Sequence, residues 1–500
     1  MQPPKKSAYP GSRAGSRAAS TERFSEKSTG QKPFAKKTST ETNRPVAKKT
    51  FAPKKEFARV AGASVATAQS QAAKRPPATR GSEPVVVIAR RAADRLRVGH
   101  VWVYSTDVEA LVPAQGATEI PPGALVEVRD GRGEGLGTAL YSSSSQIGLR
   151  LLTRAGLKNR KEFLTLIDER LRRAIRTRLQ WLSASNATMA ETDACRLVFS
   201  EADELPGIIV DRYGPLAIVQ LLAQGTHAED VRAIVVKALR EELDGESLAS
   251  IVERPDPRIR ELEQLGPSPS EPLYARTPDE PLRSTSFYLN GLRFFYDVDA
   301  GQKTGAFLDQ RENYAAASTH AHGRALDVCT YQGGFALHLA RVCAQVTGVD
   351  ASRAALEVAE KNLAENKMQL VDEGRGVDWL EANAFDLLRD WSDSGERFDT
   401  IVLDPPAFAK SKRAVEGAVR GYKEMNLRAL KMLQPGGTLV SCSCSHHVSL
   451  AEFFSVIADA AVDAGRRVQL IETRGAALDH PAILSLPETQ YLNCLIFRIH

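Results

Sequence analysis

Residues 326–350, LDVCTYQGGFALHLARVCAQVTGVD, combine two apolar runs with a glycine turn between them. The first run ends at Asp327, the chain turns through Gly333 and Gly334, a helical pattern follows, and the second run ends at Asp350. In a doubly wound α/β sheet, this order places the turn at the carboxyl edge of the first strand and the second acid within reach of a ribose. The segment therefore predicts a site for a nucleoside-containing cofactor.

The glycine spacing of this turn separates two classes of nucleoside cofactor. A dinucleotide site uses a third glycine, as in G-x-G-x-x-G, so that helix and strand pack closely beside the pyrophosphate. Here Gly334 is followed by Phe335, Ala336 and Leu337. The turn therefore favours a nucleoside without phosphates, S-adenosyl-L-methionine, over NAD. An ordinary βαβ unit with a glycine turn is the alternative to any cofactor site.

Downstream of this segment, apolar runs of strand length alternate with helical patterns. Ser352 is suited to cap a helix whose Leu356, Ala359 and Leu363 share one face. The other predicted elements are a strand ending at 383–386, a strand at 398–403, a helix at 422–433 ended by Pro-Gly-Gly, a strand at 438–441, a helix at 450–464 and strands at 468–472 and 492–499. This alternation predicts an α/β fold, a doubly wound Rossmann-like domain over residues 301–500.

Residues 84–155 carry short predicted strands separated by glycine turns. The strands are expected at 85–88, 124–129, 138–141 and 147–152. Such spacing is typical of a small β-barrel. Trp102 and Tyr104 lie near several arginines, a combination that suits single-stranded RNA because bases stack on aromatic rings while arginines meet phosphates. A core position for both aromatic residues is an equal alternative.

Residues 156–300 read as an α+β block. The predicted elements are a helix at 161–181, strands at 195–199, 208–210 and 216–222, a helix at 229–243, a loop near 255–281 and strands at 286–289 and 292–297. Asn290-Gly291 between the last two strands is a strong signal for a two-residue hairpin turn. No set of side chains in this block suggests chemistry, so its predicted role is that of a scaffold.

Residues 1–83 hold 18 basic and 5 acidic side chains, whereas the whole chain holds 66 and 61. Large apolar residues are sparse in this segment, which predicts a disordered basic arm. Such an arm is either a solubilising tail or a collector of polyanions such as RNA through counterion release. Its Arg- and Ser-rich, acid-poor composition also resembles an organelle transit peptide.

The six cysteines have no framework spacing, which argues against a disulfide scaffold and favours a reducing cytosol. No run approaches the roughly 18 to 20 apolar residues that a membrane helix needs, so we expect a cytoplasmic protein without a membrane segment. Cys442, Cys444, His446 and His447 are four potential metal ligands within six residues. Ligands so close together cannot easily surround one tetrahedral zinc, so no metal site is predicted.

Two further segments follow strands and therefore lie at the same predicted sheet edge as the glycine turn. Asp404-Pro405-Pro406-Ala407-Phe408 follows the fourth strand, and its prolines fix a rigid loop with free carbonyls that could hold a flat base. The alternative is a stiff strand-to-helix turn without a ligand.

Cys444 follows the fifth strand and suggests nucleophilic chemistry. Attack of a thiolate on carbon 6 of a pyrimidine makes carbon 5 able to take a methyl group from a sulfonium. A small buried hydrophobe is the alternative role of a lone cysteine. Cys442 points to the same side of a continuing strand, so periodicity alone does not choose between the two cysteines.

Five segments carry a resemblance to a known family. They are QKTGAFLDQR at 302–311, residues 327–335, DPPAFAKS at 404–411, SCS at 443–445 and DHP at 479–481. Over residues 84–500 the chain resembles the cytosine-carbon-5 methyltransferases of large-subunit ribosomal RNA, the RlmI group. Members of that group join a PUA barrel, a middle α+β domain and a C-terminal Rossmann-like domain that uses S-adenosyl-L-methionine.

The resemblance implies roles for individual residues. Implied cofactor contacts are Asp327, Thr330 and Gly333 at the turn, Asp350 on the ribose, Asn383 near the adenine, where the family more often has Asp, and Asp404 between methyl donor and target base. Implied substrate contacts are Gln310, Arg311, Pro405, Pro406 and Phe408. Alignment on Ser-Cys-Ser makes Cys444 the nucleophile. Many RNA cytosine methyltransferases carry a second cysteine in the Asp404 loop; none is present here, so the base that removes the carbon-5 proton has no assignment.

These observations together predict a cytoplasmic enzyme that methylates carbon 5 of a cytosine in 23S ribosomal RNA. The RNA is expected to bind through residues 84–155 and the basic arm, and a homodimer is considered. One alternative is a methyltransferase acting on a guanine nitrogen, since that chemistry requires no cysteine. A second is a non-catalytic RNA-binding assembly factor that kept the fold.

Overall fold

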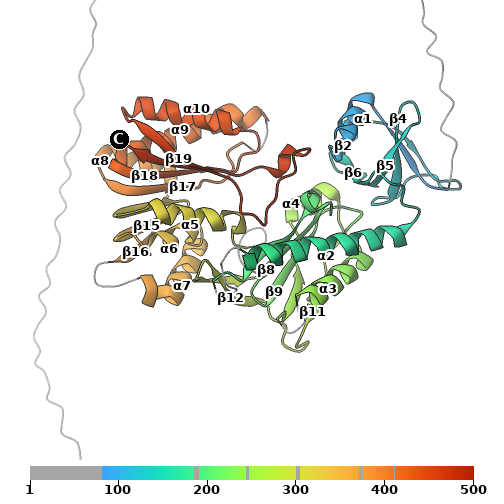
Figure 1. Cartoon of the computed structure of the whole chain (residues 1–500), viewed down its shortest axis with the longest axis horizontal. Helices are drawn as coiled ribbons and strands as arrows, with labels where there is room; N and C mark the ends of the chain where they lie inside the picture. The colour runs from blue at the N-terminus through green and yellow to red at the C-terminus, as the bar shows by residue number, and fades with distance from the viewer. Residues whose placement is uncertain (1–81, 185–190, 244–246, 300–304, 371–374, 410–411) are drawn as a thin grey trace, which may run out of the picture. The chain divides into compact units, whose positions relative to one another are not determined.

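The computed structural model describes most of the chain beyond the basic arm (Figure 1). The described residues are 82–184, 191–243, 247–299, 305–370, 375–409 and 412–500. The predicted arm lies outside them except for its last two residues, as do 302–304 and 410–411 of the family-like segments. Among the helices in these ranges, none is long and apolar enough to cross a membrane.

The predicted barrel segment forms a six-stranded sheet with one helix. Its elements are β1 (Val85–Ile88), α1 (Arg90–Arg97), β2 (Trp102–Tyr104), β3 (Val108–Val112), β4 (Leu125–Asp130), β5 (Gly135–Tyr141) and β6 (Ile147–Thr153). The strands pair in the order β2-β6-β5-β4-β1-β3. Val86, Val103 and Leu149 are buried in its core. Because neighbouring residues of a strand face opposite sides, burial of Val103 leaves Trp102 and Tyr104 half-buried.

The two aromatic residues of β2 are therefore not core residues. The indole N–H of Trp102 donates to Glu201 at 2.9 Å, which ties β2 to the middle block. The guanidinium of Arg95 lies 5.5 Å from the ring centroid of Tyr104. The alternative that placed both rings in the core is wrong, and the arginine neighbour expected beside an aromatic ring is present at Tyr104.

The middle block is built on a five-stranded sheet in the order β11-β10-β9-β8-β7. Its elements are α2 (Arg160–Ala184), β7 (Ala194–Phe199), β8 (Ile208–Tyr213), β9 (Leu216–Leu221), α3 (Glu229–Glu242), β10 (Ser250–Glu253), α4 (Pro257–Glu263) and β11 (Tyr274–Ala275). The loop predicted near 255–281 contains α4 and β11 instead. Asp256 caps α4 by accepting from the Ile259 N–H at 2.9 Å, and Pro257 follows it, which is a start signal that the sequence contained.

The predicted hairpin is confirmed as β12 (Ser284–Leu289) paired with β13 (Leu292–Asp297). Asn290 and Gly291 have φ of 52° and 79°, as a two-residue turn with two left-handed positions requires. Phe287 and Phe294 are buried in a cluster that also contains residues of the C-terminal domain. The backbone N–H of Phe295 donates to Asn362 at 2.7 Å, so the hairpin is fastened to that domain.

The C-terminal domain is a seven-stranded sheet in the order β16-β15-β14-β17-β18-β20-β19. The strands are β14 (Arg324–Val328), β15 (Gln345–Asp350), β16 (Gly376–Glu381), β17 (Phe398–Leu403), β18 (Leu433–Ser443), β19 (Val468–Arg474) and β20 (Asn493–Ile499). The first five strands in this order are parallel, and β20 pairs antiparallel with both β18 and β19.

Helices cover both faces of this sheet, as a doubly wound fold requires (Figure 1). The helices are α5 (Arg311–His320), α6 (Gly334–Leu339), α7 (Arg353–Leu370), α8 (Ala384–Ser394), α9 (Val415–Met432) and α10 (Leu450–Asp463). Residues of α5, α6 and α7 share one core cluster with the sheet, and residues of α8, α9 and α10 share the other. The carboxyl ends of β14, β15, β17 and β18 therefore meet at one edge between the two layers.

Two predicted elements differ from the structure in a way that concerns this edge. Residues 383–386 do not end a strand; β16 stops at Glu381, and Asn383 caps α8 by accepting from the N–H groups of Phe385 and Asp386 at 3.0 and 3.3 Å. An amide side chain that bonds the following backbone favours a helix start over a strand. The helix predicted at 422–433 begins earlier, at Val415.

Candidate active site

The glycine turn after β14 has an uncommon backbone. Cys329, Tyr331 and Gly333 have φ of 65°, 52° and 84°, which lie in the left-handed region that non-glycine residues rarely adopt. The Thr330 N–H donates to the carbonyl of Val349 at 2.9 Å and holds the turn against β15. A Cβ on Gly333 would lie 2.8 Å from the ring of Trp379, so only glycine fits there. Strained positions of this kind gather where a ligand is held.

Asp327 lies buried beneath this turn. Its Oδ2 accepts from the Thr330 hydroxyl at 2.5 Å and from the Ala336 N–H at 2.9 Å. Its Oδ1 is buried and has no hydrogen-bond partner among the described residues. Burial raises the pKa of Asp327 to about 7, against the lowering effect of the two hydrogen bonds.

Asp350 ends β15 beside the turn, as predicted. Its two oxygens accept from the backbone N–H groups of Tyr331 and Ser352, both at 2.9 Å. These bonds fix the orientation of the carboxylate at the sheet edge. A carboxylate has about four lone-pair sites, so it can still accept from ribose hydroxyls.

These residues fit S-adenosyl-L-methionine on three observations. The unpartnered Oδ1 of Asp327 can accept from an ammonium group, the turn leaves no room for a side chain at Gly333, and Asp350 stands at the strand end. Asn383 lies exposed at the start of α8, where its carbonyl oxygen caps the helix and its amide remains available as a donor. The structure therefore brings together the glycine turn, Asp327 and Asp350. Asn383 follows β16, the strand next to β15 in the sheet.

Asp404 follows β17 and shares the edge with Asp327. Its Oδ1 accepts from the Gln310 amide at 3.1 Å, and Gln310 in turn accepts from Asn313 at 2.7 Å. Burial, together with the nearby charges of Asp309 and Asp327, raises the pKa of Asp404 to about 8, against the lowering effect of the Gln310 hydrogen bond. Near neutral pH this carboxyl group is therefore largely protonated and can donate a hydrogen bond.

The loop after Asp404 presents one proline outward. Pro406 is exposed, whereas Pro405 is buried and Phe408 is half-buried. The ring of Phe408 packs against Tyr422 with centroids 4.8 Å apart. Pro406 and the accessible edge of Phe408 are the parts of this loop that a base can contact.

Cys444 lies at the end of β18, opposite the Asp404 loop. Its thiol is half-buried and lies 3.9 Å from the carbonyl oxygen of Pro405. The flanking serines are buried, and the hydroxyl of Tyr422 bonds both of them, at 3.0 Å to Ser443 and 2.9 Å to Ser445. Ser445 also accepts from the backbone N–H of Ala409 at 3.2 Å. Tyr422 and Ser445 thus join the segment that carries Cys444 to the loop that carries Asp404.

Cys442 occupies a different environment from Cys444. It is buried in the sheet opposite Cys494 on β20. Burial raises the pKa of its thiol well above the ordinary value, so it stays protonated. The structure thus separates two cysteines that strand periodicity could not. Among the described residues, no group of three His, Cys, Asp or Glu side chains is placed to hold a metal ion.

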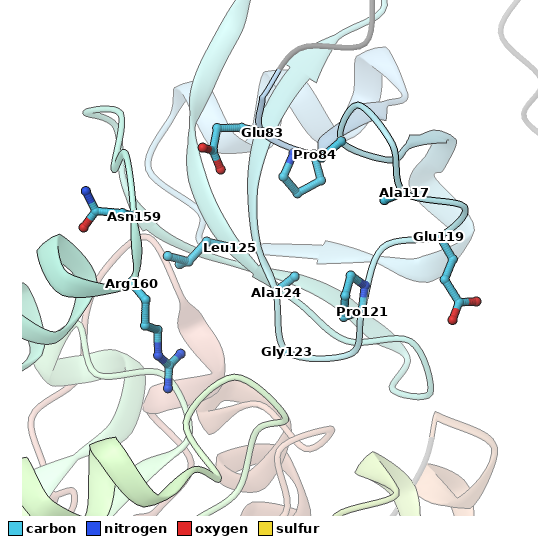
Figure 2. Close-up of a pocket in the computed structure, with 11 residues that line it drawn as sticks. Glu83, Pro84, Ala117, Glu119, Pro121, Gly123, Ala124, Leu125, Asn159 and Arg160 are labelled. Atoms are coloured by element: carbon cyan, nitrogen blue, oxygen red, sulfur yellow. The ribbon is translucent and has the colours of Figure 1, made fainter.

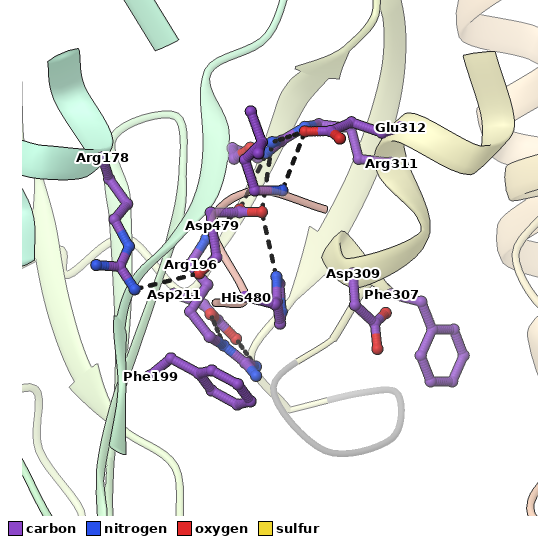
Figure 3. A network of polar contacts seen from close by, with 12 residues as sticks. Arg178, Arg196, Phe199, Asp211, Phe307, Asp309, Arg311, Glu312, Asp479 and His480 are labelled. Carbon is purple, nitrogen blue, oxygen red and sulfur yellow. Dashed lines mark hydrogen bonds and ion pairs between the residues drawn. The ribbon is translucent and has the colours of Figure 1, made fainter. Parts of the chain in front are cut away.

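Arg311 does not face the sheet edge. It is buried and forms an ion pair with Asp479, with contacts of 3.0 and 3.3 Å, and also donates to the carbonyl of Ala194 (Figure 3). Asp479 further accepts from the Arg196 N–H at 2.8 Å and contacts His480. The positive charge of Arg311 is therefore neutralised inside a structural network, which leaves little of it to attract an RNA phosphate.

Three residues at the site had no assigned role in the sequence. Tyr422 links the two loops, and Tyr491 donates its hydroxyl to Asp309 at 2.6 Å. Asp309 lies within the segment at 302–311 that carries the family resemblance, so the sequence contained a signal for its importance. Tyr491 lies 182 residues further along the chain, and no local pattern connects the two.

A separate hollow of about 400 Å³ lies where β1 and β4 of the N-terminal sheet begin (Figure 2). Its lining includes Glu83, Glu119, Leu125 and Arg160. Arg160 is engaged by Asp230 through contacts of 2.7 and 2.9 Å. The lining contains no nucleophile and shares no residue with the sheet edge described above.

Comparison with known proteins gives matches over both ends of the described chain. A family model described as a PUA-like domain matches residues 86–154, and one described as an S-adenosylmethionine-dependent methyltransferase matches residues 270–476. A Klebsiella pneumoniae protein named ribosomal RNA large subunit methyltransferase I is 36% identical over 420 residues, covering 83% of this chain and 98% of the relative. A protein of the same name from Pseudoalteromonas translucida is 36% identical over 409 residues, covering 81% and 96%.

One solved structure extends the comparison to the whole architecture. A methyltransferase complexed with SAH aligns with a TM-score of 0.67 and 17% identity, covering 83% of this chain and 99% of that chain. At this identity the likeness concerns the fold alone. It shows that the fold of the described chain occurs over nearly the whole length of another protein.

Proposed function

Because the chain belongs to the ribosomal RNA large subunit methyltransferase I family, we propose that it methylates carbon 5 of a cytosine in 23S ribosomal RNA through a covalent link to Cys444. The chain is an S-adenosylmethionine-dependent methyltransferase with a PUA-like domain. The observation that carries the carbon-5 assignment is the position of Cys444, held beside the Asp404 loop by buried hydroxyl groups on both sides.

The cofactor supplies an electrophilic methyl group. Asp327, with its unpartnered Oδ1, would bind the ammonium group, and Asp350, at the end of β15, would bind the ribose. Because the cofactor carries positive charge, acidic neighbours at this edge favour its binding electrostatically. Both acids stand at the same sheet edge as the Asp404 loop, so a cofactor held by them would lie beside that loop.

Cys444 and Asp404 act on the base from two sides. The thiolate of Cys444 adds to carbon 6, and the electron pair of the C5–C6 double bond makes carbon 5 nucleophilic. The resulting negative charge is delocalised onto N3 of the ring. A protonated Asp404 can donate a hydrogen bond there and stabilise the negative charge that develops. Asp404 thus serves as a proton donor, held in place by Gln310.

Methylation of a guanine nitrogen is the second candidate, because an acid followed by two prolines at a strand end can also hold a purine. That chemistry has no use for a thiol at the end of β18. The buried Tyr422 hydroxyl between Ser443 and Ser445 orders the residues around Cys444, which an unused cysteine would not require. This arrangement favours the pyrimidine.

A Cys444→Ala variant tests the covalent mechanism. We expect methyl transfer to ribosomal RNA to fall by at least about 1000-fold, because the variant lacks the thiolate that adds to carbon 6, while S-adenosylmethionine affinity stays unchanged. Radiolabelled methyl transfer and calorimetry measure the two quantities. Bisulfite sequencing of the product RNA identifies the modified carbon.

Cys442→Ala is the matched control, since it removes the same side chain two residues earlier from a buried position. It should retain methyl transfer and lose only stability, by about 1 kcal/mol for the deleted buried group. Full activity of Cys444→Ala would exclude the covalent mechanism and favour the nitrogen methyltransferase. RNA binding without any cofactor binding by the native chain would favour a non-catalytic assembly factor.

The proposal extends to partners and location. We propose that the PUA-like domain and the arm at 1–83 bind ribosomal RNA, supported by the family match and by the excess of basic residues in the arm. A ribosomal RNA substrate also supports a cytoplasmic location, where ribosomes assemble. A homodimer stays a prediction, which light scattering of the purified chain tests.

A further inference from the structure

We propose that Asp309 is the catalytic base that removes the proton from carbon 5 after methyl transfer. The inference rests on the proposed function, because only a carbon-5 methyltransferase has such a proton to remove. The loop at 404–411 offers no cysteine for this step. A base must therefore come from another element at the same edge.

Three other ionisable groups near the edge, Asp404, Asp327 and Cys329, suit the step poorly. Burial and neighbouring charges keep Asp404 largely protonated near neutral pH, with a pKa of about 8. Asp327 is enclosed below the glycine turn, where Thr330 and Ala336 bind its Oδ2. Burial raises the pKa of the Cys329 thiol far above neutrality, so it cannot accept a proton there.

Asp309 lies near enough to Asp404 for its charge to raise the pKa of that carboxyl group, and its chain neighbours contact both the glycine turn and Asp404. It lies in a short helical turn, Leu308–Gln310, immediately before α5. Phe307, two residues before Asp309, contacts the Tyr331 ring of the glycine turn with a distance of 5.0 Å between ring centroids. Gln310, the next residue after Asp309, donates to Asp404. Figure 3 shows Asp309 beside Phe307, apart from the ion pair that joins Arg311 to Asp479. Asp309 is half-buried, so part of it is accessible to solvent.

Tyr491 fixes the orientation of this carboxylate. Its hydroxyl donates to Oδ2 of Asp309 at 2.6 Å, and burial together with the charge of Asp309 raises the pKa of Tyr491, so the hydroxyl remains a donor. The Tyr491 ring also lies 5.7 Å from that of His446, two residues after Cys444. Tyr491 is thus a positioning residue that links Asp309 to the segment bearing the nucleophile, and one bond leaves the carboxylate able to accept a proton.

The step balances without any further reactant. After methyl transfer, carbon 5 carries both a hydrogen and the new methyl group, and carbon 6 is bonded to Sγ of Cys444. Asp309 takes the hydrogen as a proton, and the C5–H electron pair forms the C5–C6 double bond. The C6–S bond breaks, and its electron pair leaves as the Cys444 thiolate. Asp309 then releases its proton to water.

The test compares two rates on one RNA substrate that carries tritium at carbon 5 of cytosine. Native enzyme with ¹⁴C-methyl cofactor should release tritium to water and incorporate methyl in equal amounts. For Asp309→Asn we expect a single turnover of methyl transfer within about twofold of the native rate, whereas tritium release falls at least about 100-fold. The stalled species should be a methylated protein–RNA adduct that survives denaturing electrophoresis and disappears in the double variant with Cys444→Ala.

Tyr491→Phe retains the carboxylate and should slow tritium release about tenfold at unchanged methyl transfer. If Asp309→Asn fails to fold, the Tyr491→Phe variant still tests whether Asp309 is the base. Asp459→Asn, exposed on α10, is the matched control and should behave as the native enzyme. Normal tritium release in Asp309→Asn or in Tyr491→Phe would overturn the proposal, as would loss of methyl transfer together with tritium release in a folded Asp309→Asn. Absence of methyl transfer to cytosine by the native enzyme would instead refute the proposed function.

Discussion

At the scale of single residues, Asp327 and Asp404 hold protons that exposed aspartates would have lost. Burial is the main cause in both cases, and the pKa values rise to about 7 and about 8 from an ordinary 3.8. These two carboxyl groups therefore bind more protons in the folded chain than in the unfolded chain between about pH 4 and pH 8, and His338, whose pKa burial lowers to about 3, offsets part of this difference below about pH 6.5. Stability of the cofactor-free protein should accordingly decrease as pH rises through this range, because the charged forms are disfavoured in the fold.

Cofactor binding should have the opposite pH dependence. The ammonium group of the ligand favours the ionised form of Asp327, the carboxyl group proposed to bind it, so binding lowers the pKa of Asp327 and releases its proton. We expect affinity for S-adenosylmethionine to increase from pH 6 to pH 8, by up to about tenfold per pH unit for each proton released. Calorimetry in buffers of different ionisation enthalpy counts the protons. Asp327→Asn should bind more weakly and release fewer protons, whereas Asp459→Asn should match the native chain.

At the scale of elements, the ends of β17 and β18 are joined by a buried set of hydroxyl groups. Tyr422 of α9 bonds Ser443 and Ser445, and Ser445 bonds the backbone of Ala409. The three hydrogen bonds connect a helix, a strand end and a loop. They hold the segment that carries Cys444 beside the loop that follows Asp404.

A Tyr422→Phe variant separates this positioning from cofactor binding. Loss of the hydroxyl leaves two buried serines without their shared partner, which should cost about 1 to 3 kcal/mol of unfolding free energy. We expect kcat to fall about tenfold, since the thiol loses its fixed place, while S-adenosylmethionine affinity remains unchanged. Denaturant unfolding, calorimetry and methyl transfer report the three quantities. Tyr274→Phe on β11 is the control, and an equal loss there would argue against a specific role.

At the scale of the whole molecule, local patterns predicted most elements. Strand β17 at 398–403 and the turn at Asn290-Gly291 agree with the sequence because apolar runs and turn residues act over a few positions. The shared edge of Asp327, Asp404 and Cys444 also followed, since parallel strands place their carboxyl ends together. The fold class and the cofactor were predictable for the same reason.

Contacts between distant segments were not predictable. Tyr491 meets Asp309 across 182 residues, and Asp479 meets Arg311 across 168. Nothing in the local sequence indicated that Arg311 would be buried in an ion pair while the adjacent Gln310 reaches Asp404. Strand β16 was placed too far along the chain, because its residues are mostly half-buried and show no clear apolar alternation.

The basic arm gives a prediction at this scale. Deleting residues 1–81 leaves every described residue in place and removes 18 basic and 4 acidic side chains, so the formal net charge changes from +5 to −9. We expect the affinity for RNA to fall most at low salt. The slope of the logarithm of the RNA association constant against the logarithm of salt concentration should become shallower, by about 0.7 for each single-strand phosphate that the arm neutralises in the native chain. Fluorescence anisotropy across a salt titration measures the slope. An unchanged slope would show that the arm does not bind RNA, and the methylated position should stay the same.

The placement of β20 between β18 and β19 has a consequence for synthesis of the protein. Ser443 pairs with Asn493, so 50 residues must be translated before the strand that carries the nucleophile gains its antiparallel neighbour. At roughly 5 to 20 residues per second, this interval lasts roughly 3 to 10 seconds. During that time β18 is an unpaired edge strand whose side chains are buried only in the complete fold. Such a strand can pair with other nascent chains. The order of the strands therefore requires that this edge be protected while the chain is being synthesised.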